Sequence, residues 1–216
     1  MMMGDGAALV ENANGGEVTI AGLTCDSRRV APGYLFAAFP GAATDGRRFI
    51  ADAIDQGAAA VLAPEGTEVA GVPLIHDSNP RRRYASMAAA FYARQPERVV
   101  AVTGTSGKTS VVTFLGQIWS AAGHAAASLG TLGLEARDAT GAPLLVADDK
   151  PLTTPDAADL HRQLMELADA GVDRLAMEAS SHGLDQYRLD GVRVAVGVFT
   201  NLSREHLDYH ETEAAY

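Results

Sequence analysis

The chain has 216 residues, of which 47% are hydrophobic and 20% are charged, a composition typical of globular proteins with one or two domains. Its formal net charge of −10 argues against non-specific nucleic-acid binding, which needs a basic surface, but is compatible with a local anion site for a nucleotide. A single cysteine, Cys25, excludes an internal disulfide, and no apolar run approaches about 20 residues, so we expect a cytoplasmic protein that does not enter membranes.

The first part of the chain predicts short strands and helices in alternation. Residues 1–17 show no periodicity and predict a flexible lead-in. Asp45 is placed to cap a helix over residues 47–56, and a second helix is expected over residues 80–94. Apolar runs between turn signals predict strands at residues 18–23, 34–39, 58–63 and 72–75.

The second part opens with the apolar strand RVVAVT, residues 98–103, which is followed by a helix over residues 109–122. The apolar stripe of this helix comprises Val111, Val112, Phe114, Leu115, Ile118, Trp119 and Ala122. Thr154 is placed to cap a later helix with leucines on one face. Further strands are predicted at residues 125–136, 174–180 and 193–202.

This alternation predicts the fold class. Strands that are apolar on both faces and separated by helices indicate a parallel sheet covered by helices, so we expect an α/β protein. We predict an N-terminal domain over residues 18–96 and a second domain over residues 97–216, with the helix of residues 80–94 as the linker.

The loop between the first strand and helix of the second domain has the features of a phosphate-binding loop. TGTSGKT, residues 103–109, combines a strand, two glycines and a helix N-terminus, with Lys108 placed to reach terminal phosphates and Thr109 to hold Mg²⁺. The usual spacing would need a glycine at Val102. The alternative is an ordinary glycine-containing turn with an exposed lysine.

Two polar clusters follow other strands of this domain. Glu178 ends an apolar strand, where it could share a Mg²⁺ ion with Thr109, although a solvated strand-end glutamate is the alternative. FTNLSREHLDYH, residues 199–210, contains Asn201, His206, Asp208 and His210. Because the carboxyl ends of parallel strands meet at one edge of a sheet, we expect a shared site there.

These residues resemble the Mur ligase family, the ATP-dependent amide ligases of peptidoglycan precursor synthesis. TGTSGKT is similar to the family's short phosphate loop, except that most members have Asn or Gly in place of Ser106. EASSHGLDQYRL and FTNLSREHLDYH resemble the branch that adds the third stem-peptide residue. TCDSRRVAPGYLF resembles that branch's uridine-binding domain. The fold implied is a uridine-binding α/β domain followed by the first part of a parallel-sheet ATPase domain.

The resemblance implies a role for each matching residue. ATP would be held by Gly104, Thr105, Ser106, Gly107, Lys108, Thr109 and Ser110. The uridine end of UDP-MurNAc-L-Ala-D-Glu would meet Cys25 and Ser27, with Ala42, Ala43 and Thr44 nearby. Its muramoyl-dipeptide part would meet Thr153, Thr154, Ser180, Gln186 and Arg188. Thr109 and Glu178 would serve one Mg²⁺ ion and His206 a second, and Lys108, Glu178 and His206 would serve catalysis.

The implied reaction joins an amino acid, diaminopimelate or lysine, to the substrate carboxyl group through an acyl phosphate. Family members continue beyond residue 216 into a further part of the ATPase domain and a third domain, so we expect a fragment that does not ligate alone, from a parent that is monomeric. Two alternatives stay open: a non-catalytic module that binds a UDP-sugar or nucleotide, and a ligase like folylpolyglutamate synthase, which lacks the DSRRVAPG-containing domain.

Overall fold

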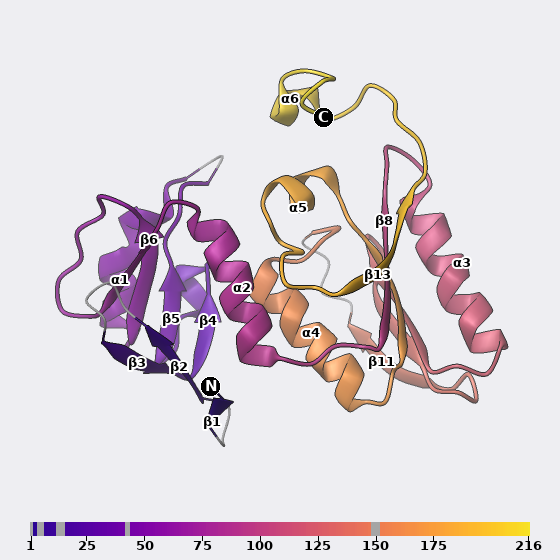
Figure 1. Ribbon diagram of the computed structural model, residues 1–216, viewed down its shortest axis with the longest axis horizontal. Coiled ribbons are helices and arrows are strands. Elements are labelled where there is room, and N and C mark those ends of the chain that lie inside the picture. Colours follow the sequence, from indigo (N-terminus) through magenta and orange to yellow (C-terminus); the bar gives the residue numbers. More distant parts are fainter. Residues whose placement is uncertain (1, 4–6, 12–15, 42–43, 148–151) are drawn as a thin grey trace. The chain divides into compact units, whose positions relative to one another are not determined.

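The computed structural model describes residues 1–216 except residues 1, 4–6, 12–15, 42–43 and 148–151. Contacts divide the chain into two compact units, Met1–Tyr92 and Ala93–Tyr216 (Figure 1). In the described part of the chain, no helix has the length and apolar character needed to cross a membrane.

The first unit is built on a parallel sheet with strand order β4-β5-β6-β7. These strands are β4 (Gly22–Thr24), β5 (Tyr34–Ala37), β6 (Ala60–Pro64) and β7 (Leu74–Asp77). Its helices are α1 (Ile50–Asp55) and α2 (Pro80–Tyr92), and short 3₁₀ turns are η1 (Ser27–Arg29) and η2 (Gly46–Phe49). The side chains of Phe36, Ala53 and Val61 form its apolar core.

Local sequence signals explain most of this unit. Asp45 caps η2 by accepting from Arg47 N at 3.0 Å, and α1 continues from that turn, as the sequence predicts. The helix predicted as a linker between the domains is instead packed within the first unit. Tyr84 and Phe91 of α2 are buried within the first unit, so this helix is part of that unit's packing.

The start of the chain differs from the predicted lead-in. An antiparallel sheet joins β1 (Met2–Met3), β2 (Ala7–Glu11) and β3 (Glu17–Ile20). The predicted strand at residues 18–23 divides at Ala21 into β3 and β4, which belong to different sheets. Antiparallel pairing between neighbouring segments gives order to sequence that has no periodicity of its own.

The second unit contains a six-stranded sheet with order β11-β10-β9-β12-β8-β13 (Figure 1). The strands are β8 (Arg98–Thr103), β9 (Ala126–Gly130), β10 (Gly133–Arg137), β11 (Pro143–Ala147), β12 (Arg174–Glu178) and β13 (Val194–Phe199). The helices are α3 (Lys108–Ala121), α4 (Ala157–Asp169), α5 (Ser181–Asp185) and α6 (Leu207–His210). The predicted α/β class is confirmed.

The predicted strand at residues 125–136 is wrong in one respect, because it forms an antiparallel hairpin of β9 and β10. Gly133 follows the turn with φ of +92°, a conformation that glycine adopts without strain. β11 then pairs antiparallel with β10. The four strands β9, β12, β8 and β13 are parallel, so their carboxyl ends lie along one edge of the sheet.

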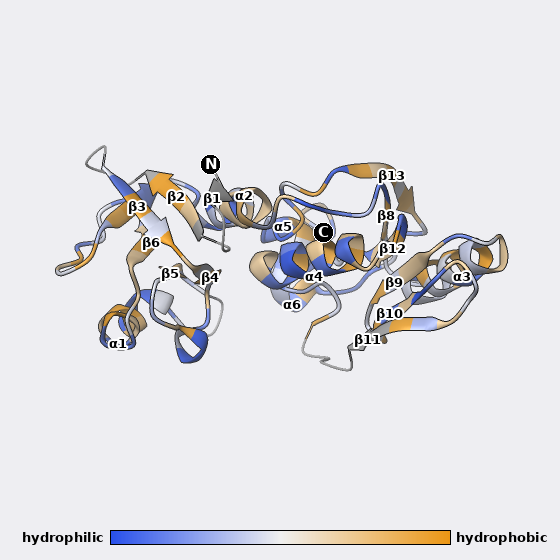
Figure 2. Cartoon of the chain, turned by 90° about the horizontal axis from the view of Figure 1, so that it is seen from below, coloured by the Kyte–Doolittle hydropathy of each residue, from blue (hydrophilic) through white to orange (hydrophobic). Residues whose placement is uncertain are grey.

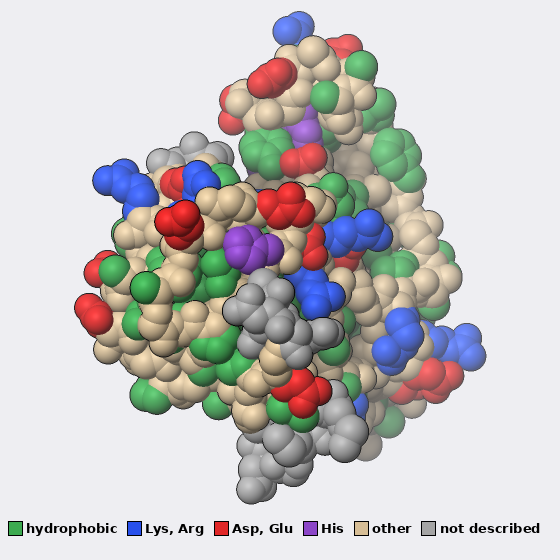
Figure 3. Space-filling model, turned by 60° about the vertical axis from the view of Figure 1, so that its left-hand side comes forward, with side chains coloured by type: hydrophobic (Ala, Val, Ile, Leu, Met, Phe, Trp, Pro, Cys, Tyr) green, Lys and Arg blue, Asp and Glu red, His purple; other side chains and the backbone are tan. Residues whose placement is uncertain are grey.

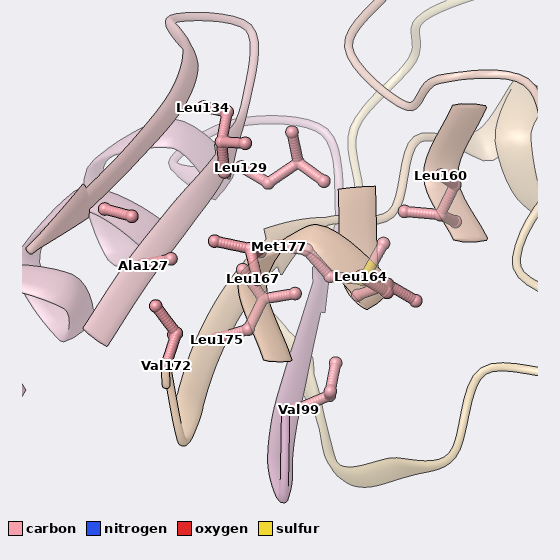
Figure 4. Packing of buried hydrophobic residues seen from close by; sticks show 11 residues of the cluster. Val99, Ala127, Leu129, Leu134, Leu160, Leu164, Leu167, Val172, Leu175 and Met177 are labelled. Carbon is pink, nitrogen blue, oxygen red and sulfur yellow. The ribbon is translucent and has the colours of Figure 1, made fainter. Parts of the chain in front are cut away.

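Helices cover both faces of this sheet because successive apolar side chains of its central strands point to opposite faces and are buried on both. Leu175 and Met177 pack under Leu160, Leu164 and Leu167 of α4 (Figure 4). Ala176 points to the other face, where α3 packs. The alternation of hydrophilic and hydrophobic residues along α4 is visible in Figure 2.

The apolar stripe of α3 is narrower than predicted. Val112 is buried against the sheet, and Val111, Leu115 and Trp119 are partly buried beside it. Phe114 and Ile118 are 59% and 60% exposed, so they lie outside the packed face. Among the described residues seen in Figure 3, acidic and basic side chains are interspersed.

One buried histidine makes the stability of the second unit depend on pH. His161 of α4 is 4% exposed, and its ring Nε2 lies 3.0 Å from the carbonyl oxygen of Asp190, which can only accept. Burial lowers the pKa of His161 below its usual value. The stability that neutral His161 provides is therefore complete above the unfolded-state pKa of about 6.5 and is lost as the pH falls toward the folded-state pKa.

We expect His161→Gln to reduce this acid sensitivity, because glutamine keeps an N–H donor for Asp190 and does not gain a proton. The measurement is the urea midpoint of both proteins at about pH 7.5 and about pH 5. The wild-type midpoint should fall further than the variant midpoint between these conditions. Equal falls would mean that His161 protonation has no part in acid unfolding.

Candidate nucleotide site

The loop between β8 and α3 has the geometry of an anion site. Thr103 ends β8, and α3 begins at Lys108, so the backbone N–H groups of the first turn lie directly after the loop. Gly107 caps the helix with φ of +89°, and Gly104 has φ of +127°. Both glycines thus occupy backbone conformations that L side chains rarely adopt.

The segment after β13 holds this loop in place. Asn201 accepts from Ser106 N at 3.1 Å through its side chain, and its amide nitrogen donates back to Ser106 O at 3.0 Å. Thr105 N donates to the carbonyl oxygen of Asn201 at 2.9 Å, and Thr200 Oγ1 donates to Ser106 O at 2.8 Å. Because β8 and β13 are parallel neighbours, residues far apart in sequence meet at this edge.

The ammonium group of Lys108 lies over the loop. Its Nζ donates to Gly104 O at 2.7 Å and to Thr105 O at 3.0 Å. An ammonium group has three donors, so these two bonds leave one for another partner. Thr109 follows in the first turn of α3.

Glu178 is buried at the end of β12, so the alternative of a solvated glutamate is wrong. Its side chain is 2% exposed. Thr131 N donates to Glu178 Oε1 at 2.9 Å, and Thr131 Oγ1 donates to Oε2 at 3.3 Å. Burial of a carboxylate is costly unless hydrogen bonds or a cation compensate it, so these contacts account for part of its placement.

The predicted helix cap at Thr154 is also wrong. The side chain of Asp156 caps α4, accepting from Ala158 N at 3.0 Å. Thr154 is fully buried, donates through Oγ1 to Glu178 O at 3.0 Å and accepts from Ser180 N at 3.0 Å. Thr154 therefore fixes the backbone where β12 ends.

The remaining polar residues after β12 form a hydrogen-bonded group. Arg188 donates through Nη1 to Thr154 O at 2.7 Å and through Nη2 to Gln186 Oε1 at 2.7 Å. Gln186 in turn donates to the hydroxyl of Tyr209 at 3.1 Å. Ser180 caps the short helix α5 by accepting from Gly183 N at 3.1 Å.

Three histidines lie together beside this group. The ring of His182 is 5.0 Å from that of His206 and 5.6 Å from that of His210, measured between centroids. Desolvation, followed by the charges of His206, His210 and Arg188, lowers the pKa of His182. His206 has φ of +55° at the start of α6.

A cavity of about 400 Å³ in the second unit collects many of the predicted site residues. The predicted residues that line it are Thr105, Gly107, Lys108, Thr109, Thr153, Glu178, Ser180, Arg188 and His206. Thr131, Leu152 and His182 also line it and were not predicted. His182 lies inside the SSHGL segment of the family motif, whereas nothing in the local sequence marks Thr131.

Other predicted residues lie around or away from this cavity. Gly104 lines a second cavity of about 300 Å³. Of the described residues, those that line neither cavity include Ser106, Ser110, Thr154 and Gln186. Cys25 and Ser27 are partly buried in the first unit, and Thr44 is exposed there. Ala42 and Ala43 lie outside the described residues.

The chemistry of the cavity suits Mg²⁺ bound with phosphate. The Thr109 hydroxyl and the Glu178 carboxylate are oxygen ligands of the kind this cation prefers, and it commonly binds through one or two carboxylates and phosphate oxygens. Among the described residues, no group of three or more His, Cys, Asp or Glu side chains could hold a metal ion by itself. The residues therefore fit an ion that is bound together with a nucleotide.

Comparison with protein families assigns both units. The Mur ligase middle domain matches residues 102–216, and the domain described as Mur ligase family, catalytic domain, matches residues 19–99. The chain belongs to the Mur ligase family. Within the family, the chain is 54% identical over 203 residues to the UDP-N-acetylmuramoyl-L-alanyl-D-glutamate--2,6-diaminopimelate ligase of Brucella melitensis biotype 1. That alignment covers 93% of this chain and 40% of the Brucella protein.

Solved Mur ligase structures share this fold. A UDP-N-acetylmuramoyl-L-alanyl-D-glutamate--2,6-diaminopimelate ligase superposes with a TM-score of 0.76 at 33% identity, covering 91% of this chain and 39% of the other. A MurF ligase from Thermotoga maritima, solved in complex with ADP, superposes with a TM-score of 0.57 at 20% identity, covering 90% and 40%. This Mur ligase chain thus spans about 40% of the length of the relatives it matches.

Proposed function

We propose that this chain supplies the uridine-binding and nucleotide-binding parts of an ATP-dependent ligase that adds meso-diaminopimelate to UDP-MurNAc-L-Ala-D-Glu. The name and the 54% identity of the Brucella relative support this substrate pair. The observation that carries the proposal is the single cavity that brings Lys108 and Thr109, at a helix N-terminus, together with Glu178 and Arg188.

In the proposed reaction, a carboxylate oxygen of the D-glutamyl residue attacks the γ-phosphorus of ATP. The bond to the bridging oxygen breaks, ADP leaves, and an acyl phosphate forms. The amine of diaminopimelate then attacks the acyl carbon to form the C–N bond, phosphate leaves with the electron pair of the broken C–O bond, and the nitrogen gives up one proton. Because both steps concentrate negative charge, the work of the protein is positioning and charge neutralisation.

The residues of the loop would perform the first of these tasks. Gly104 to Ser110 would surround the phosphates of ATP, with backbone N–H groups and the helix N-terminus facing their oxygens. Lys108 would exchange its bonds to loop carbonyl oxygens for bonds to the terminal phosphates. Thr109 and Glu178 would hold one Mg²⁺ ion and His206 a second, and Mg²⁺ neutralises phosphate charge when bound.

A second group of residues that line the cavity would hold the muramoyl dipeptide. Arg188 has a planar guanidinium group that can grip a carboxylate with two bonds, and it lies with Ser180 and Thr153 on the cavity wall. Gln186 accepts from Arg188, and Thr154 fixes the adjoining backbone. Cys25, Ser27, Ala42, Ala43 and Thr44 would contact the uridine end.

Calorimetric titration tests the proposal and separates it from the alternatives. We expect the chain to bind UDP-MurNAc-L-Ala-D-Glu and Mg·ADP and to ignore dihydrofolate. Folate binding would instead favour a folylpolyglutamate synthase-like ligase. Binding of neither UDP-muramoyl dipeptide nor nucleotide would contradict the proposal. For the whole protein, formation of UDP-muramoyl tripeptide must require ATP and diaminopimelate together, whereas binding without turnover would favour a non-catalytic module.

A further inference from the structure

Thr131 contacts both oxygens of the buried Glu178 carboxylate. Its backbone N–H is 2.9 Å from Oε1 and its hydroxyl 3.3 Å from Oε2, so both carboxylate oxygens are engaged from one residue. A carboxylate with two oxygens has about four lone-pair positions, so these bonds leave acceptor capacity on the cavity side.

The sheet explains why these groups meet. β9 and β12 are parallel neighbours with Leu129 opposite Met177, so each strand places its next residue, Gly130 or Glu178, at the same edge. A Cβ at Gly130 would collide with the Glu178 carboxylate, including Cδ at 2.6 Å. Gly130 therefore leaves space for the Glu178 side chain, and Thr131 supplies its hydrogen-bond donors.

Thr131 also contacts a second residue of the cavity wall, Thr153. Thr131 Oγ1 lies 3.1 Å from the hydroxyl of Thr153, and both threonines line the cavity with Glu178. A hydroxyl has one proton, so Thr131 cannot donate to Thr153 and to Glu178 at once. The Thr131 hydroxyl therefore has two acceptors in reach, Thr153 Oγ1 and Glu178 Oε2, while its backbone N–H donates to Glu178 Oε1.

We propose that Thr131 is a positioning residue that orients the Glu178 carboxylate for a divalent cation bound with nucleotide. This inference rests on the proposed function, since it needs Mg·nucleotide in the cavity. The hydroxyl of Thr131 contacts the carboxylate, so its removal should weaken the cation's affinity and leave metal-free nucleotide binding intact. Changes of this kind around metal ligands commonly cost about 10-fold to 100-fold in metal affinity.

The test uses three forms of the chain: wild type, Thr131→Val and Thr131→Ser. Valine has the shape of threonine without the hydroxyl, and serine keeps the hydroxyl without the methyl group. Binding of a fluorescent ADP analogue is titrated first without metal and then against Mg²⁺. We expect Thr131→Val to raise by about tenfold the Mg²⁺ concentration that gives half of the Mg²⁺-dependent change in binding of the ADP analogue. The affinity for the analogue without metal should stay within about twofold of wild type. Thr131→Ser should match wild type in both titrations.

Each other outcome has a defined meaning. Unchanged Mg²⁺ dependence in Thr131→Val overturns the role of Thr131 and leaves the proposed function standing. A serine variant as impaired as the valine variant also overturns it, because the methyl group would then be responsible. Wild-type protein that binds no nucleotide overturns the proposed function and this role with it. Thermal unfolding of all three proteins identifies a variant that is misfolded. If that variant is Thr131→Val, the Mg²⁺ dependence of Thr131→Ser is compared with that of wild type, and a difference between them overturns the role of Thr131.

Discussion

Replacing Lys108 by glutamine should weaken Mg·ADP binding by about 100-fold or more. Hydrogen bonds from a charged group contribute about 1.5–3 kcal/mol each, and tenfold in affinity corresponds to about 1.4 kcal/mol. Lys108 stands in the first turn of α3, with its Nζ 2.7 Å from Gly104 O, so it already lies across the loop that would hold the phosphates. Glutamine is shorter and uncharged and cannot replace these bonds.

Arg83→Gln is the matched control for this change. Arg83 is an exposed residue of α2 in the first unit, so its replacement removes one positive charge without touching the cavity. Titration of both variants with Mg·ADP should show the loss for Lys108→Gln alone, with far-ultraviolet circular dichroism unchanged. If both variants lose affinity equally, overall charge governs binding. If neither does, the loop is an ordinary turn.

The overall fold was predictable where local signals are strong. RVVAVT, residues 98–103, coincides with β8, and the three leucines on one face of α4 are fully buried. Prediction failed where order comes from antiparallel pairing between consecutive segments whose turns the sequence does not mark. Residues 125–136 contain a run of apolar and small residues that does not show where the chain reverses, and β11 and the N-terminal strands depend on the partners they meet.

The site likewise contains residues that the sequence predicts and residues whose role depends on tertiary contacts. Glu178, Lys108 and His206 come from three separate segments, and the sequence argument places them together because parallel strands share an edge. The structure brings all three to one cavity. Thr131 was missed because its contact with Glu178 depends on the register of β9 against β12. Thr154 was misassigned because a threonine before Pro155 looks like a helix cap, while Asp156 can serve that role and does.

The other large effect is expected for Gly104→Ala, which should both destabilise the second unit and abolish measurable nucleotide binding. Gly104 has φ of +127°, where an alanine is strained, at a cost of about 1–3 kcal/mol. A Cβ there would also lie 2.8 Å from Asn201 O and clash with Thr200 Oγ1. Relief of that clash must move the segment whose hydrogen bonds hold the loop, including the bond from Thr105 N to Asn201 O.

Gly123→Ala separates backbone strain from steric clash as causes of the effect. Gly123 has φ of +82°, and a methyl group added to it would meet no other atom within 4 Å. It follows α3 at the opposite end from the phosphate loop. Gly123→Ala should therefore lose about 1 kcal/mol of stability and keep full affinity for Mg·ADP. Gly104→Ala should lose more in urea unfolding and should not bind. Equal effects of the two substitutions on binding would contradict the role of the Asn201 segment in shaping the loop, because backbone strain alone would then explain both.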